Sequence, residues 1–75
     1  MTTHTYTKSA TAGRYTVHIS PSTNYGYFEC DGEAIGGLWF TGKRLTDQDG
    51  TYTTPKDVIT AVRALGYVVP REFEF

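Results

Sequence analysis

One stretch of this chain, residues 54–66, has the periodicity of an amphipathic helix, and this limits how the remaining residues can fold. Its apolar side chains recur at the i, i+3, i+4, i+7 spacing of one helix face, and they are Val58, Ile59, Ala61, Val62 and Leu65. Thr54 and Pro55 suit the N-cap and the first helical position, and Gly66 suits the left-handed residue after a helix. Such a short helix is unstable alone in water, so it must pack on apolar surface from the preceding residues.

Alternating side chains and turn residues dominate the rest of the chain, which indicates an antiparallel sheet. Residues 14–20 alternate clearly, and residues 24–30 and 33–41 are two further strands joined by Asp31-Gly32. Asp-Gly is a strong signal for a two-residue hairpin, because both positions take positive φ. The weaker segments are 2–8 as a polar edge strand or tail, 10–13 as a turn, and 44–46 with 51–52 as a short second hairpin. The pattern predicts an α+β fold, an antiparallel meander of about four strands with one α-helix packed on one face.

The register of the hairpin decides which side chains the helix covers, since a slip of one residue exchanges the two faces. The two-residue turn predicts that Phe28 lies opposite Ile35, and we expect Val17 to lie opposite Tyr27 on the neighbouring strand. The face under the helix then holds Tyr15, Val17, Ile19, Tyr25, Tyr27, Leu38 and Phe40. The open face then holds Arg14, Thr16, His18, Phe28, Cys30, Glu33, Ile35 and Trp39.

Three apolar residues of the open face, Phe28, Ile35 and Trp39, are expected to form a patch among polar neighbours. An apolar patch on a small protein usually marks a contact, and aromatic residues with a nearby arginine are typical of interface hot spots. Alternatively, residues 2–8 or the alternating residues 71–75 cover this face as an edge strand or tail. The candidate partner-binding residues are Arg14, Thr16, His18, Phe28, Glu33, Ile35 and Trp39.

The balance of charges limits the partners that the chain can bind. Seven Lys and Arg residues against eight Asp and Glu residues give a net charge of −1. Affinity for nucleic acid comes largely from neutralised phosphates, so a near-neutral chain with scattered charges is a poor binder. Stacking of bases on aromatic side chains remains the alternative, with the candidates Tyr25, Tyr27, Phe28 and Trp39. We therefore expect a protein partner or a homodimer, and nucleic acid as the second hypothesis.

Two groups of residues have the types used in metal binding or catalysis, and each has a simpler interpretation. The Asp-Gln-Asp-Gly sequence of residues 47–50 is similar to part of a calcium loop, but the position of the final glutamate is occupied by Val58. We interpret it as a turn. Cys30 and His18 are two pleats apart in the expected register, which is too far for a nucleophile and its base.

The acidic residues Glu29, Asp31 and Glu33 surround the hairpin turn. Strand alternation sends Glu29 and Glu33 to opposite faces, so we interpret the group as a solvated hairpin tip. Since no other constellation of catalytic residues is evident, we expect neither enzyme activity nor a metal or cofactor.

The length of 75 residues predicts one domain, residues 1–75, with a core of marginal stability. Cys30 is the only cysteine, which excludes an internal disulfide and a cysteine-built zinc site. No apolar run has the length of a signal peptide core or a membrane span. We therefore expect a free-standing cytoplasmic protein.

A small chain with a meander of short strands, one helix and no catalytic motif resembles the small inhibitor proteins of phages and mobile elements, anti-CRISPR proteins among them. The likeness covers the overall build. The resemblance implies a protein that acts by steric blockade of a host effector complex. A plasmid-maintenance or toxin–antitoxin protein would have a similar build.

Overall fold

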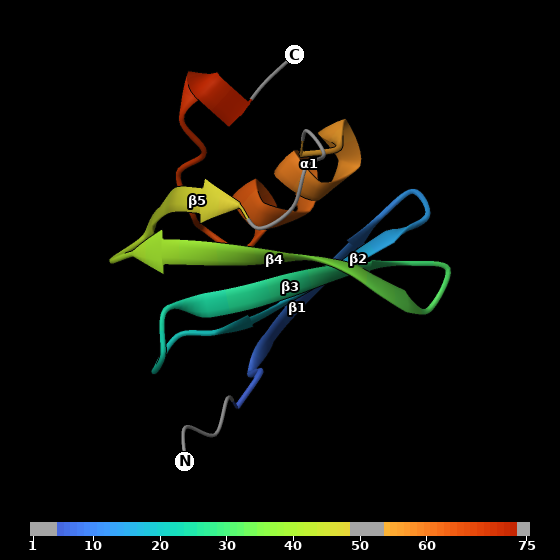
Figure 1. Ribbon diagram of the computed structural model, residues 1–75, viewed down its shortest axis with the longest axis horizontal. Helices are drawn as coiled ribbons and strands as arrows, with labels where there is room; N and C mark the ends of the chain where they lie inside the picture. The colour runs from blue at the N-terminus through green and yellow to red at the C-terminus, as the bar shows by residue number, and fades with distance from the viewer. Residues whose placement is uncertain (1–4, 49–53, 74–75) are drawn as a thin grey trace.

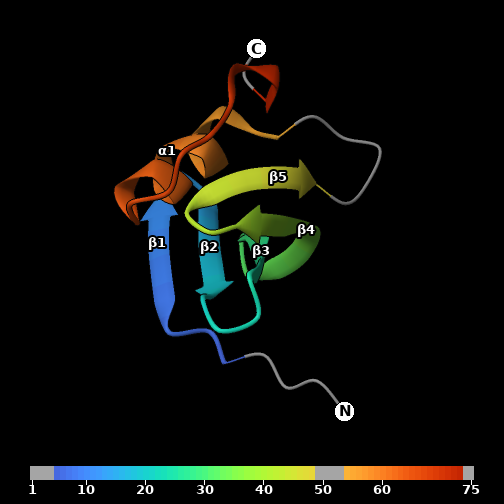
Figure 2. The same cartoon turned by 90° about the vertical axis from the view of Figure 1, so that its left-hand side faces the viewer.

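The computed structural model describes residues 5–48 and 54–73. Within these residues one antiparallel sheet has the strand order β1-β2-β3-β4-β5. The strands are β1 (Lys8–Ala12), β2 (Tyr15–Ser20), β3 (Tyr25–Cys30), β4 (Glu33–Thr41) and β5 (Arg44–Gln48). The α-helix α1 (Lys56–Ala64) lies on one face of the sheet, mainly against β1 and β2, and a short 3-10 helix η1 (Arg71–Phe73) follows (Figures 1 and 2).

The expected α+β class and the antiparallel meander are confirmed, with five strands in place of about four. The additional strand is β1. Its residues were expected to belong partly to the polar segment 2–8 and partly to a turn at residues 10–13. Ala10 and Ala12 belong to this strand and pair with Val17 and Tyr15, and the turn is confined to residues 13–14. Small side chains at an edge strand carry little β signal, so the neighbouring strand decides the outcome. Residues 2–4 and 51–52 lie outside the described residues.

The beginning of α1 corrects the expected cap. Pro55 is the N-cap residue, and the structure has no side-chain cap hydrogen bond there. The Thr54 hydroxyl instead donates a hydrogen bond to Oε1 of Gln48, and Thr54 is buried. A hydroxyl that lies in the interior needs a partner more than an exposed helix end does, so the tertiary contact replaces the local one.

The end of α1 is as the sequence predicts. Gly66 has a φ of 91°, in the left-handed region. Its N–H donates to the carbonyl of Arg63 at 3.0 Å, and the N–H of Tyr67 donates to the carbonyl of Val62 at 3.3 Å. These two bonds form a Schellman motif, which satisfies carbonyls that the helix leaves unpaired. The motif also directs Tyr67 into the core, where its ring lies 4.7 Å from that of Phe40.

The last described segment remains on the helix side. Val68 is extended and forms a parallel bridge with Arg44, in agreement with the expected extended conformation before Pro70. Residues 71–73 form η1 in place of the expected alternating strand, and Phe73 packs against the core. It therefore does not cover the open face of the sheet, and residue 75 lies outside the described residues.

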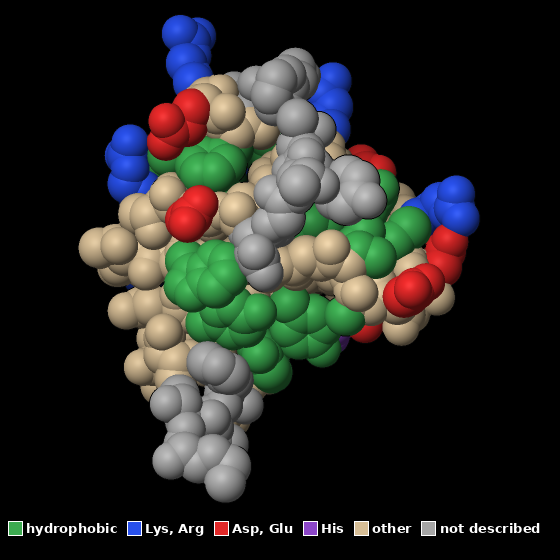
Figure 3. Space-filling view, viewed as in Figure 1, with side chains coloured by type: hydrophobic (Ala, Val, Ile, Leu, Met, Phe, Trp, Pro, Cys, Tyr) green, Lys and Arg blue, Asp and Glu red, His purple; other side chains and the backbone are tan. Residues whose placement is uncertain are grey.

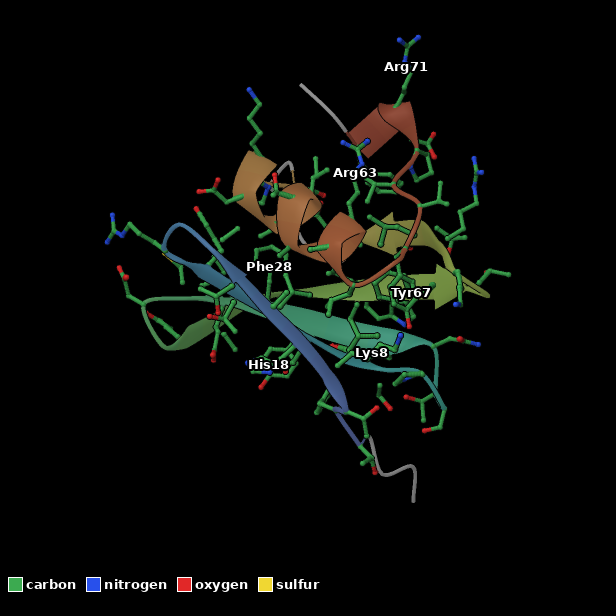
Figure 4. The ribbon with its side chains drawn as sticks, turned by 180° about the vertical axis from the view of Figure 1, so that it is seen from behind. Lys8, His18, Phe28, Arg63, Tyr67 and Arg71 are labelled. Carbon is green, nitrogen blue, oxygen red and sulfur yellow. The ribbon has the colours of Figure 1, made fainter. Side chains whose placement is uncertain are left out.

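The core lies between α1 and the inner face of the sheet. Its buried apolar residues are Val17, Ile19, Phe28, Leu38, Phe40, Leu45, Val58, Ile59, Ala61, Val62, Tyr67 and Val69. Phe28, 2% exposed, lies on the helix side of the sheet, and His18 lies on the opposite side (Figure 4). Among the described residues, no helix has the length and the apolar composition needed to cross a membrane.

The β3–β4 hairpin has the expected turn but a different register. Asp31 and Gly32 have φ values of 52° and 87°, as a two-residue turn requires. The register then shifts by one residue, so that Ile35 forms a β-bulge and Phe28 pairs with Gly36. The pairs next to the turn keep the expected register, and the inserted residue shifts every later position of β4 by one residue relative to β3.

This shift corrects the expected faces. Phe28 pairs with Val17 and belongs to the helix side, where the sequence placed Tyr27. Tyr27 pairs with His18, and Tyr25 pairs with Trp39, so both tyrosines lie on the face opposite α1. The physical reason is that Phe28 has no polar atom, whereas a buried tyrosine would need a partner for its hydroxyl.

Candidate functional site

The face of the sheet opposite α1 carries a group of aromatic side chains. We call it the aromatic face, and it is defined by the residues Tyr6, His18, Tyr25, Tyr27, Ile35 and Trp39. Strand alternation places these side chains here, since the residues next to them in β2, β3 and β4 point into the core. Hydrophobic side chains gather over β3 and β4 in the space-filling view (Figure 3).

The rings of the aromatic face support one another in two groups. Tyr27 is stacked on His18, with 5.0 Å between ring centroids, and Tyr6 meets Tyr27 edge-on at 4.9 Å. Tyr25 and Trp39 form a second edge-on pair at 5.1 Å. Burial raises the pKa of the Tyr6 hydroxyl, with further contributions from the nearby hydroxyls of Tyr25 and Tyr27. The aromatic side chains are therefore ordered before any partner arrives.

Two large apolar side chains of this face are exposed to solvent. Trp39 is 40% exposed and Ile35, in the bulge, is 45% exposed. The third exposed large apolar residue of the described chain, Val68, lies beside β5 at the edge of the sheet and is 53% exposed. Exposed aromatic and aliphatic groups that adjoin one another are the usual composition of a contact surface.

A row of polar side chains crosses three strands beside Tyr27. Ser9 Oγ lies 2.8 Å from His18 Nδ1, and His18 Nε2 lies 3.0 Å from Glu29 Oε1. An ionised carboxylate only accepts hydrogen bonds, so Nε2–H of His18 donates to Glu29. In the neutral imidazole, Nδ1 then accepts a hydrogen bond from the Ser9 hydroxyl. The row fixes the ring of His18 and the carboxylate of Glu29.

Ser, His and Glu are also the residue types of a hydrolytic triad. Such catalysis needs, in addition, donors for an oxyanion and a cleft that holds the substrate at the nucleophile. Ser9 is exposed on the outermost strand, and it does not line the depression that lies at the Glu29 end of the row. We therefore interpret the row as a network that positions Glu29.

An open depression of about 540 Å³ lies on the aromatic face next to Glu29. Its lining residues are Tyr25, Tyr27, Glu29, Gly32, Ala34, Ile35, Gly36 and Gly37. The small residues of β4 form its floor because they have no bulky side chains, whereas the two tyrosines rise from β3. The bulge at Ile35 creates this arrangement, since it places Gly37 opposite Tyr27.

The charged groups near the aromatic rings are acidic. Glu29 lies beside Tyr27, and Asp47 pairs with Trp39 across β4 and β5. Arg44 pairs with Thr41 at the far end of β4, so it borders this face only at the corner remote from Glu29.

Other basic side chains lie on the helix side or at turns. Lys8 lies over the ring of Tyr67, with 5.6 Å from Nζ to the centroid, and Arg63 donates to the Val69 carbonyl at 3.3 Å. Figure 4 shows Arg63 and Arg71 on the helix side of the sheet, away from His18, and Lys8 next to Tyr67. The aromatic face is therefore poor in positive charge.

Of the residues expected to bind a partner, the structure places four on or beside the aromatic face. His18 and Trp39 are part of this face, and Ile35 lines the depression. The hydroxyl of Thr16, on the same side of the sheet, forms a hydrogen bond with the hydroxyl of Thr11 at 3.1 Å. Phe28 is in the core, which corrects its expected position.

The remaining two expected residues lie elsewhere. Glu33 pairs with Cys30, two residues from Phe28, so its position is on the helix side of the sheet at the hairpin end. Arg14 lies in the β1–β2 turn, where its Nε donates to Asp31 Oδ2 at 3.0 Å. This hydrogen bond, opposed by a smaller effect of burial, holds the pKa of Asp31 below its usual value.

Sequence reasoning missed Tyr25, Tyr27, Glu29 and Ser9 as parts of this site. One signal was available, because Phe28 is the only residue among residues 25–29 with a large side chain and no polar atom. A hairpin register that buries Phe28 leaves Tyr25, Tyr27 and Glu29 together on the outer face. The position of Ser9 had no such signal, since it depends on the pairing of β1.

Cys30 is a free thiol that lies opposite Tyr15, whereas His18 lies on the other face. Among residues 5–48 and 54–73, no three His, Cys, Asp or Glu side chains are grouped as metal ligands.

Comparisons of the chain with protein-family models, with curated proteins and with solved structures found no match. The geometry of the aromatic face is therefore the basis for a functional conclusion.

Proposed function

We propose that this protein is a non-catalytic binding module that docks on a larger protein through its aromatic face. The observation that carries the proposal is the adjacency of exposed Trp39 and Ile35 to the ordered rings of Tyr25 and Tyr27. Tyrosine and tryptophan contribute much contact area at a low cost in conformational entropy, which is why they dominate interface hot spots.

The action that follows from docking is steric. A small domain that occupies a surface of a larger protein excludes the ligands or subunits that normally use this surface. This is the action implied by the resemblance to phage and mobile-element inhibitors of anti-CRISPR type. We propose a host effector complex as the target.

A nucleic-acid partner is the alternative, and the stacked rings of His18 and Tyr27 are the observation that favours it. The carboxylates of Glu29 and Asp47 oppose it, because they border the aromatic rings and repel phosphate groups. A docked protein accommodates these carboxylates by supplying donors or positive charge. The charge of the aromatic face thus favours the protein partner.

The proposal is tested by capture with three tagged baits, the wild type, Trp39→Ala and Val68→Ala. Val68 is the matched control, since it is an exposed apolar residue beside β5 that is not part of the aromatic face. A specific partner is retained from host lysate by the wild type and by Val68→Ala, and it is lost with Trp39→Ala. Its direct binding is then measured with purified proteins, with circular dichroism to verify that each variant is folded.

Three results would contradict docking on a larger protein. Retention of the same proteins by Trp39→Ala would show that the aromatic face is not the docking surface. Retention of nucleic acid that falls steeply with salt concentration would favour the alternative. A wild-type dimer in light scattering that becomes monomeric with Trp39→Ala would identify a second copy of the chain as the occupant.

A further inference from the structure

We infer that the depression beside Glu29 binds one cationic side chain, an arginine or lysine, that the docked partner inserts next to Tyr27. This inference rests on the proposed function and names the chemistry of the partner at one point of the interface. It is carried by the combination of aromatic walls, a positioned carboxylate and an acidic surround on one face.

The walls of the depression suit a cation because they present aromatic rings. A guanidinium or ammonium group is attracted to the negative face of an aromatic ring, and the attraction is stronger where water is partly excluded. Tyr27 is held by its contacts with His18 and Tyr6, and Tyr25 is held by its contact with Trp39. Because the rings are already ordered, binding does not have to immobilise them.

Glu29 supplies the counter-charge. Its Oε1 accepts the hydrogen bond from His18, and a carboxylate has a second oxygen and further lone pairs for another donor. The partly buried pair with His18 holds this carboxylate at the edge of the depression. Hydrogen bonds between an ionised carboxylate and a cationic donor are about twice as strong as neutral ones.

The shape of the depression also fits a side chain that arrives from a protein surface. It is open toward solvent, and its floor of glycine and alanine residues lets a planar group approach the strand backbone. An anionic ligand is disfavoured by Glu29 and by Asp47 on the same face. A neutral apolar side chain would leave the Glu29 carboxylate without a new partner. A cationic side chain can contact both the aromatic rings and this carboxylate.

The test is a titration of the isotope-labelled protein, followed by NMR, with four blocked tripeptides at millimolar concentrations. Their central residues are arginine, lysine, and the uncharged analogues citrulline and norleucine. We expect the cationic peptides to shift the amide signals of Tyr27, Glu29 and Gly37, and to bind about tenfold more tightly than the uncharged ones.

Two matched variants locate the charge. Glu29→Gln keeps the shape of the side chain and removes the charge, and we expect it to reduce the affinity for the arginine peptide about tenfold. Glu33→Gln makes the same change of charge near the hairpin turn but outside the depression, and we expect it to leave binding unchanged. Equal binding of arginine and citrulline peptides, or equal loss in both variants, overturns the inference. Absence of binding by any peptide also overturns it.

The failure of this inference is distinguishable from the failure of the proposed function. A protein partner that is lost with Trp39→Ala but binds Glu29→Gln as tightly as the wild type would leave the docking face in place and exclude the cation site. If no protein is lost with Trp39→Ala while the arginine peptide binds at Glu29, the depression binds cations and the docking proposal is wrong.

Discussion

The ring of Phe28 occupies the space that a side chain at position 36 would need. A Cβ atom placed on Gly36 would lie 2.6 Å from the Cε1 and Cζ atoms of Phe28, closer than any ordinary contact. The two residues pair across β3 and β4, directly after the bulge at Ile35. The glycine therefore permits the register in which Phe28 is buried, and this register presents Tyr25 and Tyr27 to solvent.

Gly36→Ala should destabilise the fold by about 1–3 kcal/mol, the usual cost of an additional methyl group in a packed interior. Urea denaturation measures this change. The double variant Gly36→Ala with Phe28→Leu should lose less than the sum of the single variants, because the smaller side chain relieves the overlap. Strict additivity would show that the contact between the two positions is not the cause.

Phe28→Ala and Trp39→Ala should differ strongly in stability, although both remove an aromatic side chain. Phe28→Ala should cost about 3–5 kcal/mol, because the residue is buried and leaves a cavity. This loss is a large fraction of the total stability of a small domain, which is about 5–15 kcal/mol. Trp39→Ala should cost about 1 kcal/mol or less, since Trp39 remains partly exposed in the native state. Equal losses in thermal or urea denaturation would contradict the assignment of the two faces.

The ion pair between Arg14 and Asp31 predicts a dependence of stability on pH. The folded-state pKa of Asp31 is below its usual value of 3.8 because of the hydrogen bond from Arg14. A carboxyl group with a lowered pKa contributes stability above its unfolded-state pKa and loses this contribution as the pH falls through its folded-state pKa.

Asp31→Asn is the variant that isolates this effect, since asparagine tolerates the positive φ of this turn position. The wild type should be more stable than Asp31→Asn near neutral pH, and the difference should vanish once the pH is well below 3.8. Because the pair is exposed, the difference should also shrink in high salt. A difference between the urea midpoints that persists in acid would indicate an effect of the turn itself.

Gly66→Ala tests the end of the helix. Alanine in the left-handed region costs about 1–2 kcal/mol, and the φ of Gly66 is 91°. We expect Gly66→Ala to lower the free energy of unfolding by this amount, and Gly66→Asn to lower it less, because asparagine visits this region more readily. The same stability for wild type and Gly66→Ala would show that the Schellman motif rearranges at no cost.

Several elements of the fold are predictable from short stretches of sequence. The end of α1 at Gly66, the Asp31-Gly32 turn and the bounds of β4 at residues 33–41 agree with their expected positions. Each of them depends on backbone preferences of a few adjacent residues, such as positive φ at glycine and aspartate. Local energies of this kind are present in the chain before it folds.

The identity of the docking face needed the tertiary structure. Alternation in β3 defines two sets of side chains, but it does not state which set is buried. The bulge at Ile35 decides this, because the fit of Phe28 against Gly36 and beneath α1 outweighs an uninterrupted ladder.

The row from Ser9 to Glu29 likewise depends on the pairing of three strands, and no local signal predicts its hydrogen bonds. The sequence by itself thus determined the elements, their turns and the α+β class, since these follow from interactions between near neighbours. Which aromatic residues meet solvent was decided only by the packing of the helix on the sheet, where the burial of one phenylalanine determines the position of two tyrosines.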